Sequence, residues 1–133
     1  MITTLNSYLI EEGFETQIDN VGIYLPKHNI DIVTEDEYFV ISSCDYDVTI
    51  AYSNEEVITY IKDIVYSQEL SEEMDKNNYT YEKESARYFK IENDKIKIID
   101  GRFYLEDKNG ETAVYVNISS IVSAIQSKLL GEK

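Results

Sequence analysis

The segment that begins at Ser53 carries the strongest fold signal in the chain. Ser53 and Glu56 have the spacing of a capping box, in which two side chains satisfy backbone N–H groups at a helix start. Apolar residues then recur at helical spacing, which predicts a helix over residues 53–66 with one buried stripe: Val57, Ile58, Ile61, Ile64 and Val65. An amphipathic helix of this kind must pack on another apolar surface.

Short stretches of alternating apolar and polar residues lie on both sides of this helix and predict strands. They cover residues 14–18, 21–25, 30–32, 38–42 and 48–52 before it, and 88–91, 96–99, 103–105 and 113–118 after it. Asn109-Gly110 between the last two is a strong hairpin signal. Strands joined by short turns predict an antiparallel β-meander, so we expect an α+β fold with two to three helices packed on the sheet.

Two further helices are predicted near the ends of the chain. Residues 3–12 place Leu5, Tyr8 and Leu9 on one face and lead to Gly13, a natural left-handed cap. Residues 120–130 precede Gly131 and carry an apolar stripe: Ile121, Val122, Ile125 and Leu129.

Length and composition limit the architecture and the location of the protein. With 133 residues, 43% of them apolar, the chain can fill one core, so we expect a single domain over residues 1–133. Residues 67–85 are polar and predict a helix tail followed by an exposed connection between two halves.

No apolar run approaches the roughly 18 residues that span a bilayer. No secretory signal is recognisable, and the single cysteine agrees with a reducing compartment, so we expect a cytoplasmic protein with no membrane contact.

The charge is strongly negative and unevenly placed along the chain. Twenty-six acidic and 12 basic side chains give a net charge of −14. Residues 1–66 contain 13 acidic and 2 basic side chains, whereas residues 67–133 contain 13 and 10. Binding to nucleic acid and to anionic membranes depends on basic side chains, so the balance argues against both. It favours a basic protein surface as the partner.

The sequence contains no recognisable catalytic, metal or cofactor signature. One cysteine and one histidine are too few for a structural zinc site, and a Cys44–His28 nucleophile pair has no local activating motif. Carboxylate pairs such as Asp45 with Asp47 are common by chance in so acidic a chain. The five glycines form no phosphate-binding loop. We therefore expect no enzyme activity, no metal and no cofactor.

Four aromatic residues of the second half could form a platform on which nucleic-acid bases stack: Tyr88, Phe89, Tyr104 and Tyr115. Proteins that stack nucleic-acid bases add a positively charged groove to such aromatics. Because the overall charge balance opposes a positive groove, packing within the sheet is the preferred interpretation.

The candidate partner-binding residues are the acidic positions at the turns and the helix start of the first half. They are Glu35, Asp36, Glu37, Asp45, Asp47, Glu55 and Glu56. The predicted meander allows the turn before Tyr38 and the helix start after Tyr52 to lie near one end of the sheet, with Asp45 and Asp47 at the opposite end, and it leaves the exact grouping open. If Glu15, Asp19 and Asp31 share that face, the carboxylates match the spacing of nucleic-acid phosphates.

The first half resembles the layout of small phage anti-CRISPR inhibitors that mimic DNA. The resemblance covers residues 1–66: a short helix, a β-meander, the stretch from Glu37 to Ser42, and the acidic helix start from Ser53 to Glu56. It implies a non-enzymatic inhibitor whose acidic loops occupy the DNA-binding groove of a CRISPR nuclease. Residues 67–133 have no counterpart in that layout.

An assembly module of a bacterium or phage is the alternative function. Such a module binds through an exposed sheet edge or an apolar patch, so its association survives high salt. Oligomeric state and strand order are open at this point.

Overall fold

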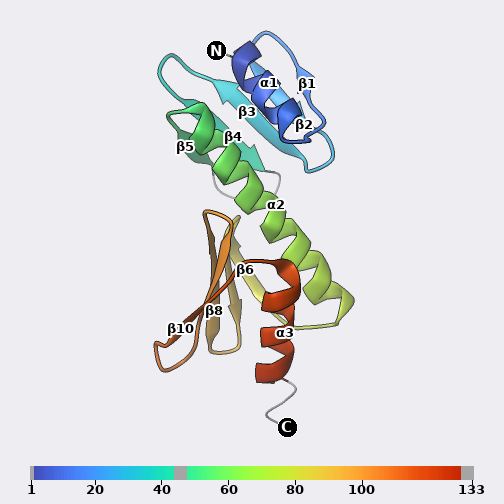
Figure 1. The fold of residues 1–133 in the computed structure, drawn as a ribbon, viewed down its shortest axis with the longest axis vertical. Coiled ribbons are helices and arrows are strands. Elements are labelled where there is room, and N and C mark those ends of the chain that lie inside the picture. Colours follow the sequence, from blue (N-terminus) through green and yellow to red (C-terminus); the bar gives the residue numbers. More distant parts are fainter. Residues whose placement is uncertain (1, 44–47, 130–133) are drawn as a thin grey trace. The chain divides into compact units, whose positions relative to one another are not determined.

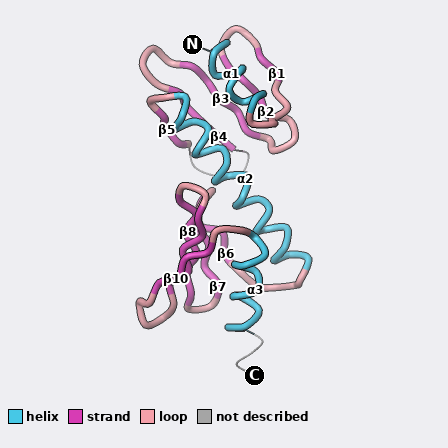
Figure 2. The backbone as a smooth tube through the Cα atoms, viewed as in Figure 1, coloured by secondary structure: helices cyan, strands magenta, loops and turns pink. Residues whose placement is uncertain are grey.

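The computed structural model describes residues 2–43 and 48–129, and the chain divides into two compact units (Figures 1 and 2). Unit 1 is Met1–Ile61 and unit 2 is Lys62–Lys133, so the boundary falls within helix α2 (Asn54–Lys76). Unit 1 also contains α1 (Ile2–Glu11), β1 (Gln17–Ile18), β2 (Gly22–Leu25), β3 (Ile30–Thr34), β4 (Phe39–Ser43) and β5 (Thr49–Ala51). Unit 2 also contains β6 (Glu82–Ser85), β7 (Tyr88–Ile91), β8 (Asp94–Ile99), β9 (Arg102–Glu106), β10 (Thr112–Tyr115) and α3 (Ile118–Leu129).

In unit 1 the strands form one antiparallel sheet, sheet A, in the order β1-β2-β3-β4-β5. Its central register pairs Ile23 with Ile32 and Ile32 with Ile41, so these side chains share the inner face. All three are buried, as are Leu5 and Leu9 of α1 and Val57 of α2. The core of unit 1 therefore lies between the inner face of sheet A and these two helices.

The end of α1 is fixed by the predicted glycine cap. Gly13 adopts a φ of 92°, and its N–H donates to the carbonyl of Ile10 at 3.0 Å. The Phe14 N–H donates to the carbonyl of Leu9 at 3.0 Å, which completes a Schellman motif. The prediction that the first helix ends at Gly13 is confirmed.

Unit 2 has its own antiparallel sheet, sheet B, in the order β10-β9-β8-β7-β6. Alternate residues of the three central strands are buried: Phe89, Ile91, Ile96, Ile98, Phe103 and Leu105. They cluster with Leu70 and Met74 of α2 and with Ile121 and Ile125 of α3. The inner face of sheet B is thus covered by the second part of α2 and by α3.

The α+β class, the antiparallel meander and the helices near residues 53 and 120 are confirmed. The strands are divided between two sheets, where one was expected. Alternation shows that a segment is a strand but does not show which strands pair across the 30 residues between β5 and β6. The single-domain prediction concerns cooperative folding and stays a prediction. No helix in the described ranges is long and apolar enough to cross a membrane.

The predicted helix tail after residue 66 is confirmed, but the exposed connection is shorter than expected and covers only residues 77–81. Helix α2 continues to Lys76, and β6 occupies residues 82–85. Ser67, Leu70 and Met74 are buried, because their spacing of three and four residues places them on one face of the helix. Two large apolar residues are enough to bury this face, although the segment is polar overall.

The start of α3 also differs from the prediction. The Asn117 side chain caps the helix, since its Oδ1 accepts the Ser120 N–H at 2.8 Å. The helix therefore begins at Ile118, and the preceding strand ends at Tyr115 instead of residue 118. The Leu129 side chain, Leu130 and Gly131, also part of the prediction, lie outside what the structure describes.

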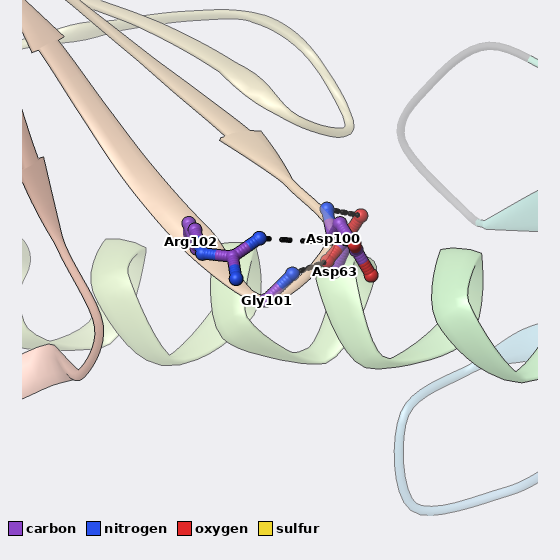
Figure 3. Close-up of polar contacts among 4 residues, drawn as sticks. All are labelled: Asp63, Asp100, Gly101 and Arg102. Carbon is purple, nitrogen blue, oxygen red and sulfur yellow. Dashed lines mark hydrogen bonds and ion pairs between the residues drawn. The ribbon is translucent and has the colours of Figure 1, made fainter.

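A buried carboxylate of α2 holds the turn between β8 and β9 (Figure 3). Asp63 is 1% exposed, and its two oxygens accept the N–H groups of Asp100 at 2.9 Å and Gly101 at 2.8 Å. Asp100 and Gly101 form a two-residue turn with φ values of 50° and 76°. The N–H groups of such a turn have no partner in the β-ladder, so Asp63 satisfies both.

Burial raises the pKa of the Asp63 carboxyl, because a low-dielectric environment disfavours the ionised form. The hydrogen bonds from Gly101 and Asp100, and the charge of Arg87, oppose this rise. The folded state thus holds the proton more tightly than the unfolded state. The stability contributed by this group is fully present below its ordinary pKa and is lost as the pH rises through the raised value.

We predict that Asp63→Ala lowers the free energy of unfolding by about 2 to 4 kcal/mol, because two hydrogen bonds to a charged acceptor are lost. Asp63→Asn retains one carbonyl oxygen and should lose less. Urea unfolding at several pH values measures both. The stability difference between the parent and Asp63→Asn should shrink as the pH rises from about 3.8. If the stability difference instead grew with pH, the hydrogen bonds to Asp63 would lower its pKa by more than burial raises it.

Candidate functional site

Three of the seven predicted site residues lie in the turn between β3 and β4. Glu35, Asp36 and Glu37 are all exposed. The Glu35 N–H donates to the carbonyl of Tyr38 at 2.9 Å and closes the turn. Three adjacent carboxylates are therefore displayed by a short segment that is fixed at both ends by strands.

Two more of the predicted residues lie in the first turn of α2. The Ser53 Oγ accepts the Glu56 N–H at 3.2 Å, as expected of an N-cap. Glu55 is exposed and Glu56 is half-buried. Carboxylates are favourable here because the helix dipole places partial positive charge at its N-terminus.

The sheet register brings these two acidic groups to the same end of sheet A. Phe39 pairs with Thr34 on one side and with Ala51 on the other, so the β3–β4 turn and the chain leaving β5 are neighbours. The rings of Tyr38 and Tyr52 lie 6.3 Å apart and link the two segments. We call this surface the acidic end: Glu35, Asp36, Glu37, Glu55 and Glu56.

Asp19 lies in the β1–β2 turn at the same end of sheet A. The Thr34 N–H donates to the carbonyl of Val21 at 3.0 Å, which joins this turn to the end of β3. The Asp19 Oδ1 accepts the N–H groups of Val21 and Gly22, both at 2.9 Å. This carboxylate therefore has a structural role in addition to its charge.

The structure shows where two of the other acidic positions lie, Asp31 and Glu15, and both are apart from the acidic end. Asp45, Asp47 and Cys44 lie outside the described residues. Asp31 is exposed on the face of sheet A that points away from the core, and Glu15 is exposed before β1. The five carboxylates of the acidic end are thus the part of the predicted site that the structure brings together.

An apolar row on the outer face of sheet A was not anticipated from the sequence. Val33 pairs with Val40, and Val40 pairs with Ile50, so the three side chains lie side by side. Val33 is 38% exposed and Ile50 is 46% exposed. Tyr52, next to the acidic end, is 67% exposed. Only the register of the three strands places these residues together, and the sequence does not specify that register.

A groove of about 350 Å³ in unit 1 contains one residue of the acidic end. Its lining comes from α1 and from the first turns of α2: Tyr8, Glu12, Asn54, Glu55, Ile58 and Thr59. An aromatic ring beside two carboxylates suits the long stem and cationic head of a lysine or arginine.

The structure also locates the residues considered for catalysis and metal binding. His28 is half-buried, and its ring centroid lies 6.0 Å from that of Phe14 in an edge-to-face contact. Within residues 2–43 and 48–129, no group of histidine, cysteine and carboxylate side chains is arranged to hold a metal ion.

Comparison with models of known protein families, with curated proteins and with solved structures finds no match to this chain. The site is therefore described by its own geometry and charge alone.

Clustered carboxylates repel each other, so we predict that added salt stabilises the parent protein. Its free energy of unfolding should rise by about 0.5 kcal/mol or more between low and moderate ionic strength. The variant Glu35→Lys/Asp36→Lys/Glu37→Lys should show a smaller rise. The matched control is Glu69→Lys/Glu72→Lys/Glu84→Lys, three exposed positions of unit 2. Equal salt responses for all three proteins would mean that repulsion among the carboxylates of the acidic end is no stronger than elsewhere on the surface.

Proposed function

We propose that this chain is a non-enzymatic acidic binding protein that inhibits a partner by occupying its basic, nucleic-acid-binding groove. An anti-CRISPR protein acting on a CRISPR nuclease is the specific form that the resemblance of residues 1–66 favours. The acidic end is the contact surface, and its carboxylates take the place of nucleic-acid phosphates.

The convergence of two acidic segments at one end of sheet A carries this proposal. The β3–β4 turn and the start of α2 are separate in sequence, but they meet through the pairing of Phe39 with Ala51 and the Tyr38–Tyr52 contact. Unit 1 has 12 acidic side chains and one basic side chain, Lys27. A surface with so little internal neutralisation attracts a basic partner and accelerates its association.

The apolar features of unit 1 support a protein partner. Protein interfaces combine an apolar centre with a polar rim, and aromatic residues are enriched in them. Tyr52 and the Val33–Val40–Ile50 row provide exposed apolar area beside the charged turn. The groove at Tyr8 and Glu55 provides a place for a basic side chain of the partner.

The same apolar row favours the alternative, an assembly module that binds through the outer face of sheet A. The two functions differ in the force that drives binding. Groove occupation depends on charge and weakens with salt, whereas association through Val33, Val40 and Ile50 persists at high salt.

The test is competition with DNA for a guide-loaded CRISPR nuclease. The parent protein should reduce DNA binding at low salt, and the effect should weaken as salt is added. The variant Glu35→Lys/Asp36→Lys/Glu37→Lys should associate about tenfold or more slowly, because it places like charges against the groove. The Glu69→Lys/Glu72→Lys/Glu84→Lys control should inhibit nearly as well as the parent.

Two results would count against the proposal. The first is inhibition that is unchanged in the triple variant of the acidic end, which would show that these carboxylates only solvate the surface. The second is a protein that does not compete with DNA at any salt concentration but still associates with a partner at high salt. If Val40→Lys abolishes that association, the outer face of sheet A is the binding surface. That outcome supports the assembly alternative.

A further inference from the structure

The outer face of sheet B carries a basic and aromatic surface that the overall charge conceals. The strand register arranges it as two rows. One row crosses all five strands in the order Thr112, Glu106, Lys95, Lys90 and Glu82. The other crosses four strands in the order Val114, Tyr104, Lys97 and Tyr88. Along each of β7, β8 and β9, the residues of these rows alternate with buried residues that point to the core. Both rows therefore face away from the core.

Three lysines meet at the centre of these rows. Lys90 and Lys95 are directly paired across β7 and β8, and Lys97 is two residues from Lys95 on the same strand. All three are exposed. Within the described ranges, neither Lys90 nor Lys95 forms an ion pair. Like charges placed opposite each other destabilise a sheet, so this arrangement gains from an anionic ligand.

Two tyrosines flank the central lysine. Lys97 pairs with Tyr88 on one side and with Tyr104 on the other. Its Nζ lies 5.6 Å from the centroid of the Tyr88 ring. Cations alternating with aromatic rings on an open sheet are the combination that single-stranded nucleic acids use, since bases stack on the rings while lysines neutralise phosphates.

A hollow of about 230 Å³ lies within this surface. Tyr104 and Ile99 give it an apolar lining, and Lys95 and Lys97 are its cations; Glu106 and Thr112 complete it. A flat base fits against an aromatic and aliphatic lining, with its phosphate beside the lysines.

We propose that the outer face of sheet B binds single-stranded nucleic acid through Lys90, Lys95, Lys97, Tyr88 and Tyr104. The net charge of −14 argued against nucleic acid, but 11 of the 12 basic side chains belong to unit 2. Charges farther away than the Debye length of about 10 Å are largely screened, so the interaction depends on the side chains of this face, where the three lysines outnumber Glu82 and Glu106. An acidic protein, including a second copy of this chain, also offers carboxylates, whereas a single strand repeats a phosphate and a stackable base at every nucleotide. The inference is independent of the acidic end.

The experiment measures binding of the full chain to short fluorescein-labelled oligothymidylate and oligouridylate by anisotropy, from low to moderate salt. We expect salt-sensitive binding to either or both probes, the comparison showing whether DNA or RNA is preferred. Lys95→Glu/Lys97→Glu should weaken binding at least tenfold and reduce the salt slope by about 1.4, as two phosphate contacts are lost. Tyr104→Ile, which puts another residue favoured in strands at this position but removes the ring, should weaken binding about fivefold or more with an unchanged slope.

The matched control is Lys76→Glu/Lys108→Glu, which makes the same charge change at two exposed lysines off this face. It should bind within about twofold of the parent, and circular dichroism confirms that each variant is folded. Absence of binding to both probes at low salt, or equal losses in the control and in Lys95→Glu/Lys97→Glu, would overturn the proposal. Salt-sensitive self-association that only Lys95→Glu/Lys97→Glu abolishes, without oligonucleotide binding, would also overturn it and identify a second copy as the ligand.

Discussion

Electrostatic repulsion among the carboxylates of unit 1 is the constraint on which the functional account depends. Twelve acidic side chains share this unit with a single lysine, so they cannot be neutralised by ion pairs within it. Some of them are placed where backbone N–H groups stabilise a negative charge, as at Asp19 and in the first turn of α2. The carboxylates of the β3–β4 turn face solvent and keep their attraction for a basic partner.

Carboxylates of this chain serve two different purposes. In unit 2, Asp63 is buried and holds a tight turn by accepting two hydrogen bonds, so this side chain serves the fold. In unit 1, Glu35, Asp36 and Glu37 are exposed and contribute charge to a surface. Unit 2 also displays exposed lysines on the outer face of sheet B, although its acidic side chains still outnumber its basic ones by 14 to 11.

Local patterns predicted the elements well, whereas long-range pairing was not accessible from the sequence. The Ser53 cap, the Gly13 cap and the strand alternation depend on neighbouring residues, and all appear in the structure. Three features depend on long-range pairing: the division into two sheets, the Val33–Val40–Ile50 row and the lysine cluster. A helix tail after residue 66 was predicted, but its length, to Lys76, was not, because only Leu70 and Met74 mark its buried face. Asp63 was missed because nothing near it in sequence reveals its partners, Asp100 and Gly101.

The central claim is that the acidic end concentrates the attraction of this protein for basic surfaces. A titration of the isotope-labelled protein with a short oligolysine, followed by backbone amide chemical shifts, tests it without knowledge of the natural partner. The account predicts that the largest shift changes occur at residues 35–37 and 55–56 and that added salt suppresses them. Changes of equal size at the exposed acidic residues of unit 2, such as Glu69, Glu72 and Glu84, would contradict it.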